Sequence, residues 1–344
     1  MSILRAVADD LLEALVLPSF TRIGYAARRR LWGWDDPSSW SLAGRTVVIT
    51  GPTSGLGREA ARSLARMGAR LVLVGRDAGR LEETRAELAA LAPDASLATF
   101  VADMSSLPSV RAAADAILAS EPRIDVVIDN AGAIFAERGE TEAGIERTFA
   151  TMVAGPFVLV ARLLPRLLAA PDGRVVAVTS GGMYTQSLPL DDLGYTRGTY
   201  QGALAYARAK RAQVALAREW TRRLRGSGGV RAHDGQGPDG GAGTVPAINA
   251  MHPGWADTPG LEASLPGFRK LMGGLLRSPA EGVDTLLWLA AAPEAGRRSG
   301  GLYLDRRPRL FDRIPSTRLS ATDRRELWDR VVAMTGEPDP APER

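Results

Sequence analysis

The stretch Thr46–Gly57, TVVITGPTSGLG, decides the fold of this 344-residue chain. It begins with a short β-branched run, which is typical of a buried strand, and continues through glycines into a helical pattern. Gly51 allows a tight turn, and Gly55 and Gly57 let the backbone and the helix N-terminus approach a pyrophosphate closely. The spacing is G-x3-G-x-G, so the strand–loop–helix context carries the prediction of a dinucleotide-binding loop.

Strand and helix patterns alternate along most of the chain, and runs such as LVLV are apolar throughout, as in strands covered on both faces. This pattern predicts an α/β fold: a Rossmann-like doubly wound parallel sheet of about seven strands flanked by helices, with an N-terminal helical extension. The expected strands are Thr46–Thr50, Arg70–Val74, Leu97–Val101, Ile124–Ile128, Arg174–Thr179, Ala247–Met251 and Gly301–Leu304. The expected helices are 57–67, 81–91, 110–119, 142–170 and 200–224.

Two segments flank the expected domain, which covers residues 44–310. Residues 1–43 carry apolar residues at helical spacing between Leu4 and Leu15, which predicts an amphipathic helix followed by an Arg- and Trp-rich segment. This segment either docks on the body of the protein or lies peripherally on an anionic membrane surface. Residues 311–344 are expected to form a short polar helix and a frayed tail.

Two further segments interrupt the strand–helix pattern inside the domain. Residues 226–245 are crowded with glycine and are predicted to form a surface insertion. Residues 261–276, LEASLPGFRKLMGGLL, are predicted to form a lid with glycine and proline hinges.

The composition excludes several classes of site. The chain has no Cys and only two His, which excludes disulfides, thiolate metal sites and a His-rich zinc site, so no metal is expected. The net charge is +4 and the acidic residues are spread along the chain, which favours an Arg-rich surface over a nucleic-acid-binding patch. The longest apolar run near the N-terminus, Ala14–Leu17, is too short for a signal peptide, so a cytoplasmic location is expected.

The end of the second expected strand indicates which dinucleotide is bound. NAD-preferring folds place a carboxylate there against the ribose 2′-hydroxyl, whereas this chain has Gly75 followed by Arg76. An Arg can stack on adenine and pair with a 2′-phosphate, so NADP(H) is favoured. Asp77 follows directly and leaves NAD(H) as the alternative.

Three side chains are candidates for the chemistry. Tyr206 and Lys210 are four residues apart in a helical pattern and therefore share a face. A nearby ammonium lowers the pKa of a Tyr and makes it a usable proton donor or acceptor for a carbonyl/alcohol pair. Ser180 follows the fifth expected strand, where its hydroxyl can donate to a substrate oxygen.

Together these features resemble the short-chain dehydrogenase/reductase family. The matching motifs are TGPTSGLG at 50–57, Asp103, DNAG at 129–132, Ser180, Tyr206-x3-Lys210 and Pro253-Gly254-x3-Thr258. The phrases TSGGM (179–183), MHPGWADTPG (251–260), TLLWLA (285–290) and SGGLYLDRRPR (299–309) resemble one subgroup of that family.

The resemblance implies hydride transfer between a nicotinamide and a carbonyl or carbinol carbon. Tyr206 is expected to be the acid/base, Ser180 to orient the substrate oxygen, and Lys210 to lower the pKa of Tyr206 and hold the nicotinamide ribose. The expected cofactor-binding residues are Gly51, Thr53, Ser54, Gly55, Leu56, Gly57, Arg76, Asp103, Met104, Asn130, Ala131, Gly132, Tyr206, Lys210, Pro253, Gly254, Trp255 and Thr258.

The chain departs from the family at Met152, which stands where the resemblance implies a catalytic Asn that holds a water beside Lys210. A thioether cannot donate a hydrogen bond and accepts only weakly. Two hypotheses follow: an NADP-preferring enzyme whose proton relay is rerouted, or a non-catalytic dinucleotide-binding sensor or scaffold. Asp129 in place of the first Asn of NNAG is a milder change.

The substrate class is inferred from the residues expected to line the pocket. Met152, Met183 and Tyr184 are large and apolar, as is Trp255, which borders them. They indicate a lipophilic carbonyl or alcohol such as a retinoid, steroid or fatty aldehyde. Pairing through long helices, which the resemblance implies, makes a homo-oligomer the expectation.

Overall fold

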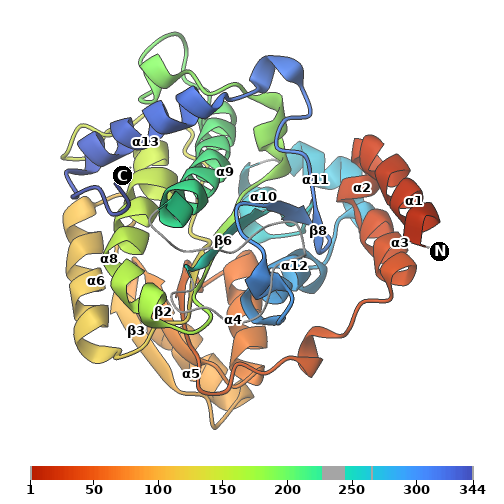
Figure 1. Cartoon of the computed structure of the whole chain (residues 1–344), viewed down its shortest axis with the longest axis horizontal. Coiled ribbons are helices and arrows are strands. Elements are labelled where there is room, and N and C mark those ends of the chain that lie inside the picture. The colour runs from red at the N-terminus through yellow and green to blue at the C-terminus, as the bar shows by residue number, and fades with distance from the viewer. Residues whose placement is uncertain (1, 227–244, 265, 343–344) are drawn as a thin grey trace.

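The computed structural model describes residues 2–226, 245–264 and 266–342 (Figure 1). An eight-stranded sheet runs through its centre in the order β3-β2-β1-β4-β5-β6-β7-β8, parallel except for the last pair. The strands are β1 (Thr46–Thr50), β2 (Arg70–Gly75), β3 (Leu97–Val101), β4 (Val126–Asp129), β5 (Arg174–Val178), β6 (Ala247–Met251), β7 (Leu302–Leu304) and β8 (Arg307–Pro308). The predicted doubly wound sheet is confirmed, with a short antiparallel edge strand added.

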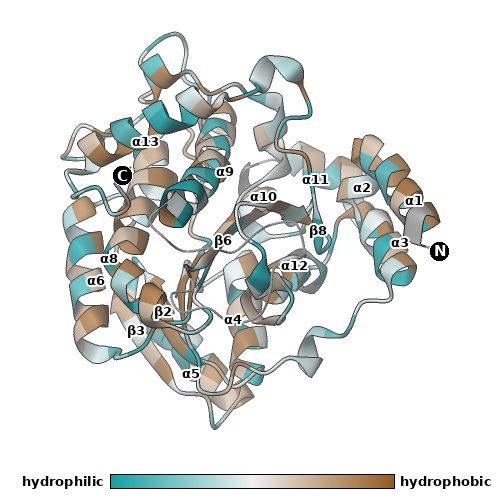
Figure 2. Ribbon diagram, viewed as in Figure 1, coloured by the Kyte–Doolittle hydropathy of each residue, from teal (hydrophilic) through white to brown (hydrophobic). Residues whose placement is uncertain are grey.

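Helices cover both faces of this sheet. Alternate residues of β1 show the division, because Val47 and Ile49 pack with α4, α5 and α12, whereas Val48 packs with α6, α8 and α9. The helices are α1 (Ser2–Ala14), α2 (Val16–Phe20), α3 (Arg22–Trp32), α4 (Gly55–Arg66), α5 (Ala78–Leu91), α6 (Leu107–Ser120), α7 (Arg147–Phe149), α8 (Gly155–Ala169), α9 (Gly202–Gly226), α10 (Pro259–Ser264), α11 (Pro266–Met272), α12 (Pro279–Ala291) and α13 (Ala321–Thr335). Apolar residues accordingly concentrate in the central strands (Figure 2).

The helix expected over 142–170 begins only at Arg147. It also contains a π-helical turn at Ala150–Ala154, where Met152 lies. The apolar periodicity of the sequence does not reveal the π turn, because the turn adds one residue without interrupting the buried face. The span Arg147–Ala169 is long and apolar enough to cross a membrane by composition, but 67% of its most apolar stretch is buried, as in a core helix.

The C-terminal tail does not fray within the described residues. Trp328 of α13 is fully buried against Phe157 and Trp220. Beyond the helix, Glu337 pairs with Arg111, and Asp339 accepts from the Trp328 indole at 3.2 Å. The tail was expected to be mobile because of its polarity, but ion pairs with distant residues hold it.

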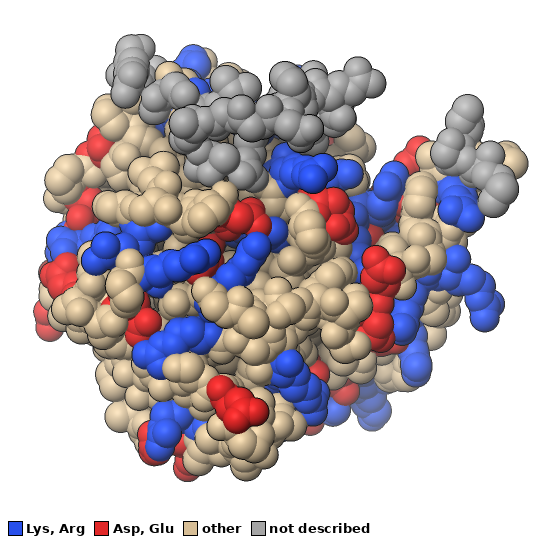
Figure 3. Space-filling view, turned by 60° about the horizontal axis from the view of Figure 1, so that its bottom comes forward, with Lys and Arg blue, Asp and Glu red and all other residues tan. Residues whose placement is uncertain are grey.

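Residues 2–32 form three helices, not one, and they make a lobe at the edge of the molecule beside α12 and β8 (Figure 1). Basic and acidic side chains are interspersed over the face seen in Figure 3, and several basic ones lie on this lobe. The expected insertion at 226–245 lies, apart from its two end residues, outside the described residues.

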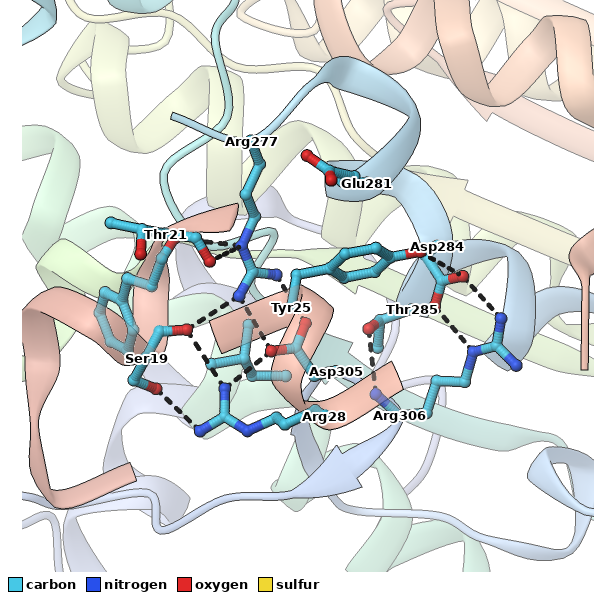
Figure 4. A network of polar contacts seen from close by, with 12 residues as sticks. Ser19, Thr21, Tyr25, Arg28, Arg277, Glu281, Asp284, Thr285, Asp305 and Arg306 are labelled. Atoms are coloured by element: carbon cyan, nitrogen blue, oxygen red, sulfur yellow. Dashed lines mark hydrogen bonds and ion pairs between the residues drawn. The ribbon is translucent and has the colours of Figure 1, made fainter. Parts of the chain in front are cut away.

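A buried network of charges joins the lobe to the domain (Figure 4). Asp305 accepts from Arg28 at 2.7 Å and from Arg277 at 2.6 and 2.9 Å, and all three side chains are buried. Asp305 and Arg306 form the two-residue turn between β7 and β8, and both have φ of 55°. This left-handed backbone is strained in a residue such as Arg, so the ion pairs on both side chains stabilise the turn.

Candidate active site

The glycine-rich loop after β1 has the geometry of a phosphate-binding turn. Gly51 and Gly55 have positive φ, and a Cβ at Gly57 would overlap the Gly51 carbonyl oxygen and the Asn130 amide. The N-terminus of α4 follows at once, so its free backbone N–H groups face the same space. Only glycine fits this cradle, and a pyrophosphate suits the donors that it presents.

The loop is fixed to the end of β4 by side-chain hydrogen bonds. Asn130 donates its amide to the Thr50 carbonyl at 2.9 Å and to that of Gly51 at 3.2 Å. The Thr50 hydroxyl accepts from the backbone N–H groups of Asn130 and Ala131. The predicted DNAG motif therefore lies against the predicted cofactor loop.

The segment after β6 reaches the same loop from the other side. A Cβ built on Gly55 would lie 3.5 Å from the Thr258 Cβ. Gly254 has φ of +72°, and Trp255 donates its backbone N–H to the Phe20 carbonyl at 2.8 Å. Pro253 packs close to Gly282 at the start of α12. The structure thus places Pro253–Thr258 beside Gly51–Gly57, as expected for one continuous binding edge.

The remaining expected cofactor residues lie along this edge. Arg76 is exposed after β2, beside Asp77, which caps α5 through the Arg80 N–H. Asp103 is exposed after β3, and its Oδ1 accepts from the Ser105 N–H and hydroxyl. Arg76 and Asp103 are thus both exposed at the carboxyl ends of neighbouring strands.

Ser180, Tyr206 and Lys210 meet at the carboxyl end of β5. Ser180 lies two residues after the end of β5 and interacts with the Tyr206 hydroxyl. Lys210 is one turn further along α9 and donates from Nζ to the Val178 carbonyl at 2.8 Å, with Nζ 5.5 Å from the Tyr206 ring centroid. The predicted catalytic set is brought together.

The protonation equilibria at this site are shaped by burial. Burial raises the pKa of Tyr206 to about 12, and the Ser180 hydroxyl opposes that rise. Burial lowers the pKa of Lys210 to about 8, and the Asp129 carboxylate opposes that fall. Lys210 Nζ lies over the Tyr206 ring, so the expected stabilisation of a Tyr206 phenolate by the ammonium stays a prediction.

Met152 lies within the candidate catalytic site. A Cβ built on Gly132 would be 3.2 Å from the Met152 Sδ and 3.4 Å from the Lys210 Nζ, so thioether and ammonium flank the same glycine. Met152 is fully buried and projects from the π turn. Met152 therefore lies near Lys210, where the family resemblance predicts a catalytic Asn.

The other two residues expected to line the substrate pocket are also buried. Met183 and Tyr184 are buried, and the Tyr184 ring lies 6.4 Å from that of Phe20 and 5.8 Å from that of His252. They form the apolar backing of the Ser180 loop. The expected lid forms two short helices, α10 and α11, with residue 265 between them outside the described residues, and Phe268 of α11 packs on Trp255.

Sequence reasoning missed Phe20. Its ring lies 5.6 Å from Trp255, and a Cβ on Gly181 would come within 2.5 Å of its Cε2 atom. The N-terminal lobe therefore touches the residue that follows Ser180. Phe20 is more than 150 positions from Gly181 and belongs to no motif, so no sequence signal could have found this contact.

Comparison with known proteins decides the family. The model of the family described as short chain dehydrogenase matches residues 45–233. This chain belongs to the short-chain dehydrogenase/reductase family. As a member of that family, it is an oxidoreductase.

Relatives cover nearly the whole chain. The protein named Dehydrogenase/reductase SDR family member 12 from Bos taurus is 35% identical over 90% of this chain and 91% of its own, which confirms the subgroup resemblance. Retinol dehydrogenase 14 from Mus musculus is 31% identical, and the match covers 96% of this chain and 98% of that protein. The crystal structure of an uncharacterized protein from Mycobacterium Paratuberculosis has a TM-score of 0.68 at 27% identity, with 88% of this chain and 97% of that one covered.

Proposed function

We propose that this short-chain dehydrogenase/reductase interconverts a lipophilic carbonyl compound and its alcohol with NADP(H). The observation that carries the proposal is the convergence of Ser180, Tyr206 and Lys210 at the sheet edge that also bears the glycine cradle. Hydride transfer to or from the substrate carbon is the chemistry that a bound nicotinamide supplies.

The protein's own groups supply position and a proton. The Tyr206 hydroxyl gives its proton to the substrate oxygen in reduction and takes it back in oxidation. The Ser180 hydroxyl donates to the same oxygen, where negative charge develops. Lys210 is held over the Tyr206 ring by the Val178 carbonyl, and its positive charge favours the phenolate that Tyr206 becomes.

The preference for NADP(H) is assigned to Arg76. We expect Arg76→Ala to weaken NADPH binding about tenfold and to leave NADH binding within about twofold, because only NADPH carries the 2′-phosphate that the guanidinium pairs with. Isothermal titration of both cofactors into both proteins measures this. Arg85→Ala, a change at an Arg on the adjacent helix α5 that pairs with Glu82 on the surface, is the matched control. Equal loss for both cofactors would contradict the assignment.

The lipophilic substrate is supported by apolar groups near the reacting end. Trp255 contacts Phe20 of the N-terminal lobe and Phe268 of the lid helices, in both cases edge to face. A relative named for retinol oxidation fits the same class of substrate. A screen of retinoid, steroid and fatty aldehydes against NADPH absorbance tests the class.

The second hypothesis, a non-catalytic sensor or scaffold, is favoured by Met152 alone. The NADPH absorbance screen and the calorimetric cofactor titration together distinguish the enzyme from the non-catalytic protein. Cofactor binding with no absorbance change for any carbonyl or alcohol would support the sensor, whereas turnover would exclude it.

We also propose that this protein is cytoplasmic and rests peripherally on anionic membranes through its N-terminal lobe. In helix α1, Asp9 and Glu13 face the protein and pair with Arg28, while Leu4 and Leu11 are 76% and 65% exposed. Leu15, which directly follows this helix, is 61% exposed. The neighbouring α3 carries exposed basic residues, Arg22, Arg29 and Arg30. An apolar face beside exposed Arg suits a lipid surface better than a second copy of the same basic lobe.

Replacing Leu4, Leu11 and Leu15 together by Ser is expected to reduce flotation with phosphatidylserine-containing vesicles by about tenfold, since three buried side chains are lost from the bilayer contact. Leu310→Ser, at an exposed Leu outside the lobe, is the control. Light scattering on the same samples gives the oligomeric state. Unchanged flotation, or a change in oligomeric state instead, would count against the membrane contact.

A further inference from the structure

A buried carboxylate beside the catalytic lysine has no part in the proposed chemistry. Asp129 ends β4, and its Oδ2 accepts from the Gln213 Nε2 at 2.6 Å. Within the described residues its other oxygen, Oδ1, is buried and has no hydrogen-bond partner. A buried carboxylate without a full set of donors depends on a nearby positive charge.

Lys210 supplies that charge. Lys210 and Gln213 are three residues apart on α9 and so lie on one face of the helix. Lys210 Nζ donates to the carbonyl of Val178 on β5, and the neighbouring Ala177 is paired in register with Asp129 on β4. The ammonium and the carboxylate are therefore enclosed by the same helix and the same two strand ends.

Each of the two groups acts on the other. Burial raises the pKa of Asp129 to about 6, and the charge of Lys210 opposes the rise. Burial lowers the pKa of Lys210 to about 8, and Asp129 opposes the fall. Between these values both groups are charged and attract each other.

The other groups that face Lys210 carry no charge that could replace this one. Met152 faces it from the π turn, Tyr206 from α9, and the Val178 carbonyl from β5. Among the described residues, Asp129 is the one charged side chain that shifts the pKa of Lys210. Met152 offers the ammonium only a weak acceptor.

Given the proposed function, we propose that Asp129 is a positioning residue that keeps Lys210 protonated in the absence of a hydrogen-bonding side chain at position 152. When Tyr206 transfers its proton to the substrate oxygen, the phenolate forms beside Lys210, and the ammonium stabilises it. Removing the Asp129 charge lets Lys210 lose its proton at lower pH, so this stabilisation ends at lower pH as well.

The chain has only two lysines, Lys210 and Lys270, which makes a direct test practicable. In protein labelled with 13C-lysine, the Cε signal of each lysine can be followed by NMR as the pH is raised. We expect Asp129→Asn to lower the titration midpoint of Lys210 by about one pH unit, since a unit charge is lost from a buried pair. The exposed Lys270 is the internal reference and should not move.

The amide at position 129 keeps the bond from Gln213, so Asp129→Asn should retain the fold. Asp115→Asn on the exposed surface of α6 is the control for loss of a carboxylate. The wild-type protein allows a second test without any substitution. Its Lys210 signal should show a second, smaller inflection near pH 6 as Asp129 titrates. An unchanged Lys210 midpoint in Asp129→Asn, or no such inflection in wild type, would overturn the proposal.

Kinetics complete the test. The alkaline limb of the kcat profile should move to lower pH in Asp129→Asn, and adding Met152→Asn, which places an amide beside the ammonium, should move it part of the way back. Failure of wild type to turn over any substrate would refute the proposed function, while the NMR titration would still decide whether Asp129 controls Lys210.

Discussion

Tyr206→Phe should lower kcat for carbonyl reduction by about 10³-fold and leave the affinity for NADPH nearly unchanged. The substitution keeps the aromatic ring that Lys210 lies over and removes only the hydroxyl that exchanges a proton with the substrate. Initial rates of NADPH consumption at saturating substrate measure kcat, and calorimetry measures cofactor affinity.

Tyr200→Phe is the matched control, because its hydroxyl pairs with Thr148 and Glu146 away from the catalytic lysine. It should change kcat by less than about threefold. A Tyr206→Phe enzyme that kept a tenth or so of wild-type kcat would show that another group provides the proton.

Asp305→Asn should destabilise the protein by about 3–5 kcal/mol, because it leaves the buried Arg277 without the carboxylate that it pairs with, whereas Arg28 keeps Asp9 and Glu13. Asp305 is the shared acceptor of Arg28 and Arg277, and none of the three is exposed to solvent. A thermal midpoint lower by about 6–10 °C is expected for a chain of this size. Differential scanning calorimetry at neutral pH measures it.

The pH dependence of this stabilisation has a definite sign. Arg277 and Arg28 hold the pKa of Asp305 below its ordinary value despite burial. The stabilisation is therefore complete above the pKa of an unfolded Asp, about 4, and is lost as the pH falls through the lower folded value. Glu326→Gln, in an exposed pair with Arg330, is the control and should cost less than about 1 kcal/mol. Equal losses for the two variants would contradict the role of the buried network.

Local patterns predicted the parts of the site that lie within one element or at one strand end. The glycine loop, the Tyr206–Lys210 spacing and Ser180 after β5 all depend on the periodicity of strands and helices, and the structure brings them together. The parallel arrangement of the strands follows from the alternation of strands and helices, whereas their order in the sheet comes from the structure.

Features that depend on distant contacts were not predictable in this way. The π turn leaves the apolar pattern of 147–169 intact, so its extra residue is invisible in the sequence. Phe20 reaches Gly181, and Arg28 reaches Asp305, only because of how the lobe docks. The inward face of α1 carries charges and its outward face leucines, so a rule that places apolar residues inside misassigns both faces.

The buried network also orders events during synthesis. Arg28 can pair with Asp305 only after the ribosome has synthesised a further 277 residues. Asp9 can pair with Arg309 only after a further 300 residues. At about 5–20 residues per second, a ribosome needs roughly 15–60 s to cover such an interval. The N-terminal helices thus emerge first, but the buried ion pairs that join them to the domain can be completed only after residue 309 has been synthesised. Phe20 belongs to the same lobe, so the ion pairs that hold the lobe beside Gly181 form late in synthesis.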